Sequence, residues 1–160
     1  MAALDARIDY EASPEIREIL ARISRTEDVK LSPDNSRLAI ADFARNRIFL
    51  FSIHIQGLEN NAAPPRVQML DYSVITSDSF KQPHGVTFLG NDHLLVCNRA
   101  ADVCVYELPA PGDHPRERTL EPHQVIRGQG VLRARVKTPG SADCYALGDR
   151  CYRVLVCNNH

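Results

Sequence analysis

The feature that most constrains the fold of this chain is a repeated strand-like segment. The segment Leu95–Asn98, with the sequence Leu-Val-Cys-Asn, returns 60 residues later as Leu155–Asn158. A related run, Leu38–Asp42, lies about 56 residues earlier. Repeats with a period of this size, carried by β-type segments, are typical of radial or stacked arrays of sheets. The sequence therefore predicts an all-β protein made of similar units.

Each unit repeats the same order of strands and turns. Short runs rich in β-branched, aromatic and leucine side chains are bounded by Gly, Pro, Asn or Asp, which predicts antiparallel strands joined by tight turns. Asp42, Asn98 and Asn158 end the second run of each unit, where we expect their side chains to shape the turn. Candidates for a fourth strand are Arg66–Leu70 and His123–Ile126. Four antiparallel strands are the content of one β-propeller blade.

Two stretches carry a resemblance to known propellers. The run Ser32–Asp42 is similar to the "SPDG-x-x-LAVAD" strand pair of many propellers, and Asn46–Phe51 follows it in the same way. Pro83–Val86, followed by Leu94–Val96, resembles blades of the NHL-repeat group and of the seven-bladed lactonase group (the 6-phosphogluconolactonase type). The resemblance implies two complete four-stranded blades and a partial third. The chain has no Trp, so the WD-type subclass is not expected.

The predicted organisation is an N-terminal extension, residues 1–25, and a partial propeller, residues 26–160. Its repeats fall at about 26–80, 81–137 and 138–160, the last one incomplete.

The extension contains one helix signal. Ser13 and Pro14 are suited to the N-cap and first helical position. The apolar residues that follow recur at helical spacing and form one face: Ile16, Ile19, Leu20 and Ile23. We predict a helix from Pro14 to about Arg22 or Ile23. Residues 1–12 are expected to be loose, and the proline-rich insert Ala110–Glu121 is expected to be a loop.

Two units and half of a third cannot close a propeller ring, which needs at least four blades. Open sheet edges are templates for pairing with another chain. We expect a fragment of a larger ring, with self-association or a protein partner at the open blade edges. The alternatives are a half that assembles with a partner and a different, closed fold.

Charge and hydropathy exclude some classes of partner. The chain has 19 basic and 20 acidic residues and a net charge of −1, so no basic excess attracts nucleic acid. The short basic cluster Arg116–Arg118 is interpreted as solvated surface. No apolar stretch approaches the length that spans a membrane, so no membrane partner is expected. No apolar leader segment follows Met1, which favours a cytoplasmic location.

The five cysteines show no CxxC spacing, so no metal site is predicted from them. Cys97, Cys104 and Cys157 lie in apolar strand runs and are expected to be buried, reduced thiols. A bridge between Cys144 and Cys151 is conceivable across a turn and would need an oxidising compartment.

Candidate site residues lie where the first strand of each blade begins. In a propeller these strands line the central channel, and the entering loops surround its mouth. The entering positions here are Glu27 and Asp28, then His84, then Gly140 and Ser141. Glu27, Asp28, His84 and Ser141 are therefore the ligand-binding candidates. Glu27 and His84 are the catalytic candidates, because a carboxylate beside an imidazole can act as a general base or hold a divalent cation. The alternative is that both make ordinary structural contacts.

Three functions are compatible with the sequence. The chain contains no GxSxG, HExxH or glycine-rich phosphate loop, which favours a binding or scaffolding propeller for a small molecule or a protein. The resemblance to the lactonase group implies a sugar-lactone hydrolase acting at the channel, with or without a metal. The third possibility is a truncated relic without activity of its own. Whether the protein is an enzyme stays open at this point.

Overall fold

The computed structural model describes residues 9–57, 65–126 and 136–158. Over these ranges the fold is all-β with one helix, as the repeat pattern predicted. In chain order the elements are β1 (Asp9–Ala12), α1 (Pro14–Ala21), β2 (Thr26–Leu31), β3 (Arg37–Asp42), β4 (Arg47–Gln56), β5 (Arg66–Thr76), β6 (Pro83–Leu89), β7 (His93–Asn98), β8 (Val103–Glu107), β9 (Glu117–Thr119), β10 (Gln124–Ile126), β11 (Pro139–Gly148) and β12 (Cys151–Asn158).

The strands of the described residues form three separate sheets. Sheet 1 has the order β1-β5-β4-β3-β2, with β9 also paired to β5. Sheet 2 has the order β10-β8-β7-β6, and sheet 3 consists of β11 and β12. The strands β2 to β5 form an antiparallel meander in sheet 1, and sheet 2 is antiparallel throughout. The expected fourth strands are present as β5 and β10.

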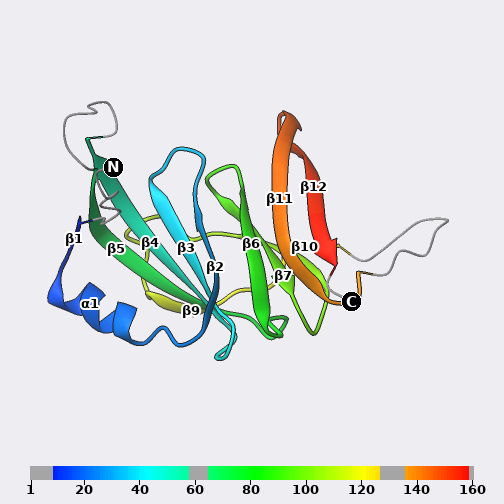
Figure 1. Ribbon diagram of the computed structural model, residues 1–160, viewed down its shortest axis with the longest axis horizontal. Coiled ribbons are helices and arrows are strands. Elements are labelled where there is room, and N and C mark those ends of the chain that lie inside the picture. The colour runs from blue at the N-terminus through cyan, green and yellow to red at the C-terminus, as the bar shows by residue number, and fades with distance from the viewer. Residues whose placement is uncertain (1–8, 58–64, 127–135, 159–160) are drawn as a thin grey trace, which may run out of the picture.

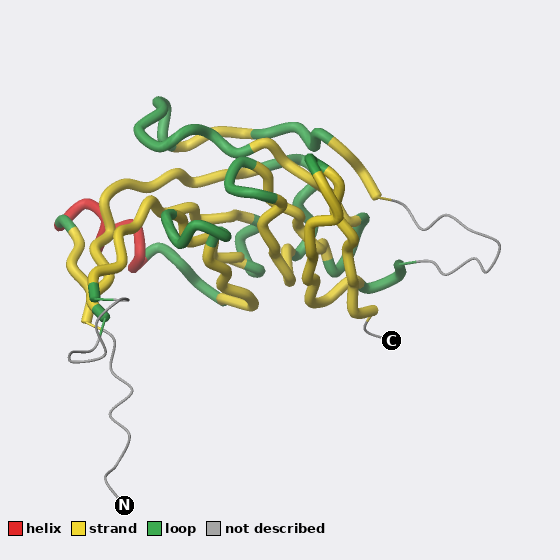
Figure 2. Tube along the Cα trace, turned by 90° about the horizontal axis from the view of Figure 1, so that it is seen from above, coloured by secondary structure: helices red, strands yellow, loops and turns green. Residues whose placement is uncertain are grey.

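The sheets are stacked face to face with their first strands side by side. Figure 1 shows β2, β6 and β11 following one another across the molecule, with β6 between the other two. α1 lies at one end of the stack and the hairpin of β11 and β12 at the other (Figures 1 and 2). Sheets 2 and 3 approach closely where Gly85 on β6 faces the backbone of Gly140 on β11.

Apolar side chains fill the spaces between the sheets. Ala39 and Ala41 of sheet 1 pack with Val86 and Phe88 of sheet 2. Sheet 2 is covered in turn by sheet 3, in a cluster whose members include Leu95, Cys97, Ala142, Val154 and Val156. Burying one such large side chain stabilises a fold by about 1.5–3 kcal/mol, so these two layers supply much of the stability of the stack.

The helix α1 covers the other face of sheet 1. The side-chain oxygen of Ser13 accepts a hydrogen bond from the backbone N–H of Ile16 at 3.2 Å, which caps the helix as the sequence predicted. Ile16 and Ile19 are buried against Phe49 and Phe51 of β4. The predicted helix is therefore confirmed.

Two segments expected to lack regular structure are strands. Of residues 1–12, which were expected to be loose, residues 1–8 lie outside the described ranges, and Asp9–Ala12 forms β1, which pairs in parallel with the first half of β5. The insert Ala110–Glu121 was expected to be a loop, but its residues Glu117–Thr119 form β9. Although β9 lies between two strands of sheet 2 in the sequence, it pairs in parallel with the second half of β5 in sheet 1. Together β1 and β9 complete the outer edge of sheet 1.

The Asp or Asn that ends the second strand has a wider role than the predicted local turn. Asn98 is fully buried; its Oδ1 accepts a hydrogen bond from the N–H of Lys81 at 3.1 Å, and its Nδ2 donates to the carbonyl of Asp102 at 2.9 Å. Asn158 Oδ1 accepts from the N–H groups of Lys137 and Thr138. The repeated side chain thus ties the segment before the first strand to the end of the second.

Of the three cysteines expected to be buried in strand runs, two are buried. Cys97 and Cys104 are buried, whereas Cys157 is exposed, contrary to expectation. Burial, helped by the nearby Asp28 and Cys157, raises the pKa of the Cys97 thiol to about 12. Cys144 and Cys151 are free as well, so the conceivable bridge between them is not formed.

Replacing Gly85 with alanine should loosen sheet 3 from sheet 2. A Cβ atom at this position would lie 2.2 Å from the carbonyl oxygen of Gly140 and 2.7 Å from the Cα of Ser141, so the backbones must separate. We expect Gly85→Ala to lower the free energy of unfolding by about 1–3 kcal/mol in a urea titration. Gly148→Ala is the matched control, because a Cβ there meets no atom within 4 Å. Equal effects of the two substitutions would contradict the close contact.

Candidate functional site

Glu27 on β2 and His84 on β6 meet at the boundary between sheets 1 and 2. The carboxylate oxygen Oε2 of Glu27 lies 3.5 Å from Nε2 of His84, and each side chain is 17% exposed. Both residues stand near the start of a first strand, and the adjacency of β2 and β6 brings them together. Their juxtaposition agrees with the sequence prediction. A ligand-binding or catalytic role for them stays a prediction.

Neighbouring side chains hold this pair in place. The guanidinium of Arg25 forms an ion pair with the other carboxylate oxygen of Glu27, Oε1. The same guanidinium lies 4.5 Å from the ring centroid of Phe43, and the His84 ring meets Phe43 edge to face at 6.1 Å. Glu27 is therefore engaged at both oxygens. The remaining ring nitrogen of His84, Nδ1, is buried and has no hydrogen-bond partner.

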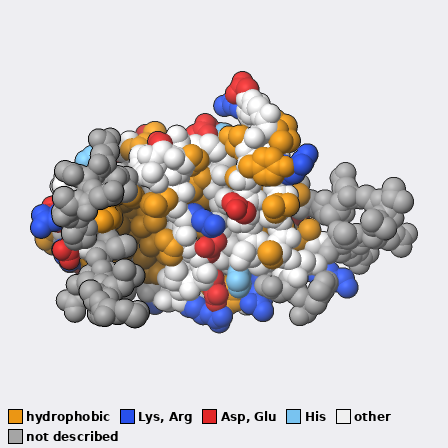
Figure 3. Space-filling model, turned by 45° about the horizontal axis from the view of Figure 1, so that its top comes forward, with side chains coloured by type: hydrophobic (Ala, Val, Ile, Leu, Met, Phe, Trp, Pro, Cys, Tyr) orange, Lys and Arg blue, Asp and Glu red, His pale blue; other side chains and the backbone are white. Residues whose placement is uncertain are grey.

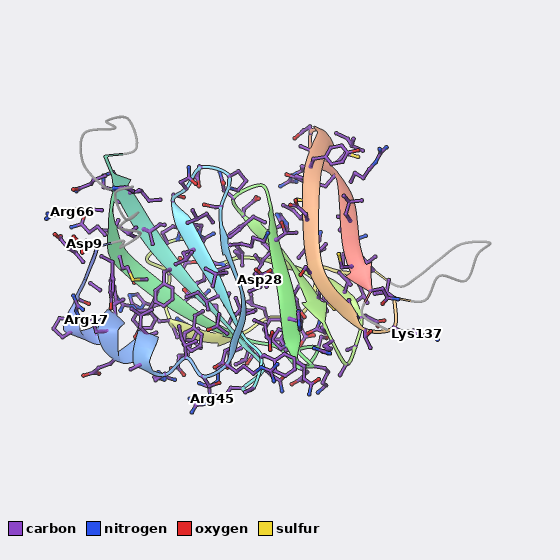
Figure 4. The ribbon with its side chains drawn as sticks, in the orientation of Figure 1. Asp9, Arg17, Asp28, Arg45, Arg66 and Lys137 are labelled. Carbon is purple, nitrogen blue, oxygen red and sulfur yellow. The ribbon has the colours of Figure 1, made fainter. Side chains whose placement is uncertain are left out.

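Asp28 is a second link between the same strands. Its Oδ2 accepts a hydrogen bond from the backbone N–H of Val86 at 2.9 Å, and its Oδ1 accepts one from the N–H of Val29. Figure 4 shows Asp28 between β2 and β6. Since β2 is an edge strand of sheet 1, the bond from Val86 attaches it to sheet 2. The carboxylate that the sequence suggested for ligand binding is thus used in the fold.

The third pair of entering residues is placed differently. Gly140 is buried at the close contact with Gly85, and Ser141 is exposed on β11. Ser141 does not share the enclosed surroundings of Glu27 and His84. Of the four ligand-binding candidates, three lie at the boundary of sheets 1 and 2, and the fourth lies on sheet 3.

The arrangement is best described as a polar clasp between two sheets. Glu27 Oε1 faces the guanidinium of Arg25 and Oε2 faces the ring of His84, so the pair and Asp28 join residues of both sheets. Within residues 9–57, 65–126 and 136–158, no group of three or more His, Cys, Asp or Glu side chains is arranged to hold a metal ion. The clasp of Glu27, His84 and Asp28 fastens β2 to β6.

One buried residue of this boundary carried no clear signal in the sequence. Arg37 on β3 is buried, and its guanidinium donates to the carbonyls of Asn91 (3.1 Å) and Pro109, both from the segments around β7 and β8. Burial lowers its pKa, and the charges of Asp34 and Asp92 oppose that shift. From the sequence alone, an Arg within a strand is expected to be exposed. Arg37 is buried because sheet 2 stacks on sheet 1.

The basic cluster interpreted as solvated surface also makes specific contacts. Arg116 forms ion pairs with Glu15 of α1 at 2.9 Å and with Asp71 of β5 at 3.2 Å. Its guanidinium lies 4.7 Å from the ring centroid of Tyr72. Arg116 therefore ties the insert before β9 to the helix and to the outer strand of sheet 1.

The clasp should appear as an energetic coupling between Glu27 and His84. We expect Glu27→Gln and His84→Ala to be non-additive in the free energy of unfolding, by roughly 0.5–3 kcal/mol in a double-mutant cycle. The control cycle combines Glu27→Gln with His54→Ala on β4, an exposed histidine, and should be additive within about 0.5 kcal/mol. A null coupling in the first cycle would show that the contact does not stabilise the boundary.

No helix in the described ranges has the length and apolar character needed to cross a membrane. Neither the protein-family models nor the curated proteins nor the solved structures include a match to this chain. Function is therefore argued from the residues and their geometry.

Proposed function

We propose that the chain is a protein-binding scaffold of the β-propeller type, whose partner is a second copy of itself. One observation carries this proposal. Some apolar positions of the repeat are buried where one sheet packs on the next. The equivalent positions at both ends of the stack are exposed. Each end therefore offers one half of an interface that the chain already uses internally.

The first half is on sheet 3. Ala39 and Leu95 stand three residues before Asp42 and Asn98, and both are 0% exposed because the next sheet covers them. Leu155 stands three residues before Asn158 and is 62% exposed. The repeat thus predicts a covering sheet for a face that is open in the single chain.

The second half is on sheet 1. Val86 and Phe88 on β6 face sheet 1 and are 0% and 4% exposed. The register of β6 with β7 and of β2 with β3 makes Val29 and Leu31 their equivalents on β2. These two side chains are 47% and 45% exposed.

The two halves match in chemistry. The cluster that α1 forms with sheet 1 includes Ile40 of β3 as well as residues of β4 and β5, and it leaves Val29 and Leu31 of β2 open. Among the described residues, sheet 3 consists of β11 and β12, and it can cover the open β2 of another copy beside its helix. Figure 3 shows hydrophobic side chains gathered on the projecting hairpin of sheet 3.

Such a contact is head to tail, because different surfaces meet. Head-to-tail contacts generate rings when the rotation between copies closes. Two copies with three sheets each would form a ring of six, within the roughly four to eight blades of known propellers. This size supports a dimer as the assembled form.

Charged substitutions at either end should weaken self-association. Leu155→Glu and Val29→Glu each replace an apolar contact with a carboxylate that would be buried, so we expect the dissociation constant to rise at least about tenfold. Sedimentation velocity over a range of concentrations measures it, with 17.9 kDa as the mass of one copy. Leu70→Glu is the control, because Leu70 on β5 is 57% exposed but belongs to neither end face. Unchanged association in both end-face variants would overturn the proposal.

A lactone hydrolase is a second candidate, favoured by the 3.5 Å contact between Glu27 and His84. The scaffold proposal predicts that hydrolysis of a sugar δ-lactone, with or without Mg²⁺, does not exceed the uncatalysed rate. Turnover that is lost in His84→Ala and kept in His54→Ala would favour the hydrolase instead. The assay is made on the assembled protein, since the channel is complete only there.

A further inference from the structure

A groove runs between sheet 3 and the outer strands of sheet 2. It has a volume of about 620 Å³. Its apolar part is formed by Val105 of β8, Ile126 of β10 and Val154 of β12. Its rim is polar and includes His93 and His123, whose rings meet edge to face at 5.5 Å. The groove lies on the opposite face of β12 from Leu155, so it is separate from the surface proposed for self-association.

One wall of this groove is an edge of β12 that no other strand of the described residues pairs. β3 is paired on both sides by β2 and β4, and β7 is paired on both sides by β6 and β8. β12 is paired to β11 alone among the strands in the described ranges. The backbone N–H and C=O groups along a free edge are a template for another strand.

The two complete sheets show what occupies the equivalent place. Val154 corresponds to Leu38 and Leu94, each four residues before the repeated Asp or Asn. Leu38 is paired with Phe51 on β4, and Leu94 is paired with Tyr106 on β8. Both aromatic side chains are almost completely buried. An aromatic side chain opposite this position is therefore common to both third strands.

The residues at the floor of the groove are equivalent to the residues on which Tyr106 packs. Tyr106 lies in one cluster with Ile48 and Leu50, which belong to the third strand of the preceding sheet. The register makes Val103 and Val105 of β8 the equivalents of Ile48 and Leu50. Val105 lines the groove, so an aromatic side chain opposite Val154 would pack on it as Tyr106 packs on Leu50.

We propose that this groove is an acceptor site for an extended apolar segment of a partner protein, which adds to β12 as an antiparallel strand and places an aromatic side chain opposite Val154. Addition of a strand to a sheet edge is an established mode of peptide recognition, in which backbone bonds provide affinity and side-chain pockets provide specificity. Successive residues of the partner strand point to opposite faces, so those that face sheet 2 should be apolar.

The test uses a fluorescent peptide with the sequence of Ala44–Ser52, the β4 segment that pairs with β3. We expect saturable binding in fluorescence anisotropy, and at least about tenfold weaker binding for the same peptide with serine in place of both Phe49 and Phe51. Equal binding of the two peptides, or no saturable binding, would overturn the proposal.

Two neighbouring residues of β12 provide a matched pair of protein variants. Val154→Glu, which faces the groove, should weaken binding of the β4 peptide at least about tenfold, whereas Leu155→Glu, on the other face, should leave it unchanged. Self-association should be weakened by Leu155→Glu and unchanged in Val154→Glu. Failure of the peptide-binding proposal is therefore distinguishable from failure of the self-association proposal. Loss of peptide binding in both variants would contradict the assignment to the groove.

Hydrogen exchange on the unmodified protein covers the case in which Val154→Glu does not fold. Added peptide should slow amide exchange in Cys151–Asn158 and leave exchange in Arg37–Asp42 unchanged, since β3 is already paired on both edges. Protection confined to other strands would show that the peptide binds elsewhere.

Discussion

The packing of each sheet on the face of the next is the interaction on which the rest of this structure depends. Two of the three core clusters lie between sheets: Ala39 and Ala41 are buried where sheet 2 covers them, and Leu95 and Cys97 are buried where sheet 3 covers them. Solenoids and related repeat arrays share this dependence, and their terminal units need a cap. α1 caps part of sheet 1, and sheet 3 has an open face.

The polar contacts follow from the same stacking. Glu27 meets His84, and Asp28 accepts the N–H of Val86, because β2 and β6 run side by side. Arg37 is buried for the same reason. These contacts fasten neighbouring sheets where their inner strands begin, and they account for side chains whose types alone suggest a ligand site. The proposed function accordingly lies with the open faces and edges of the stack rather than with the clasp.

The sequence predicted what depends on neighbours along the chain. Short apolar runs and turn residues indicated the antiparallel strands, and Ser13 with Pro14 indicated the start of α1. β1 and β9 were missed because each pairs in parallel with β5, a distant strand, and carries no strong strand pattern of its own. The alignment of the repeats placed Glu27 and His84 at the entering positions of neighbouring units, and the structure has them in contact. The exposure of Cys157 was missed because the apolar run around it predicts a strand but does not tell whether another sheet covers that strand.

Cross-linking between copies tests the central claim most directly, since it reports which faces meet. One variant carries Val29→Cys and the other Leu155→Cys, both with the exposed Cys151 and Cys157 changed to serine. The account predicts that a short bismaleimide joins the two variants when they are mixed, with little product when Leu70→Cys replaces Leu155→Cys. Equal yields in the two mixtures, or a product only within the Leu155→Cys variant alone, would contradict head-to-tail stacking.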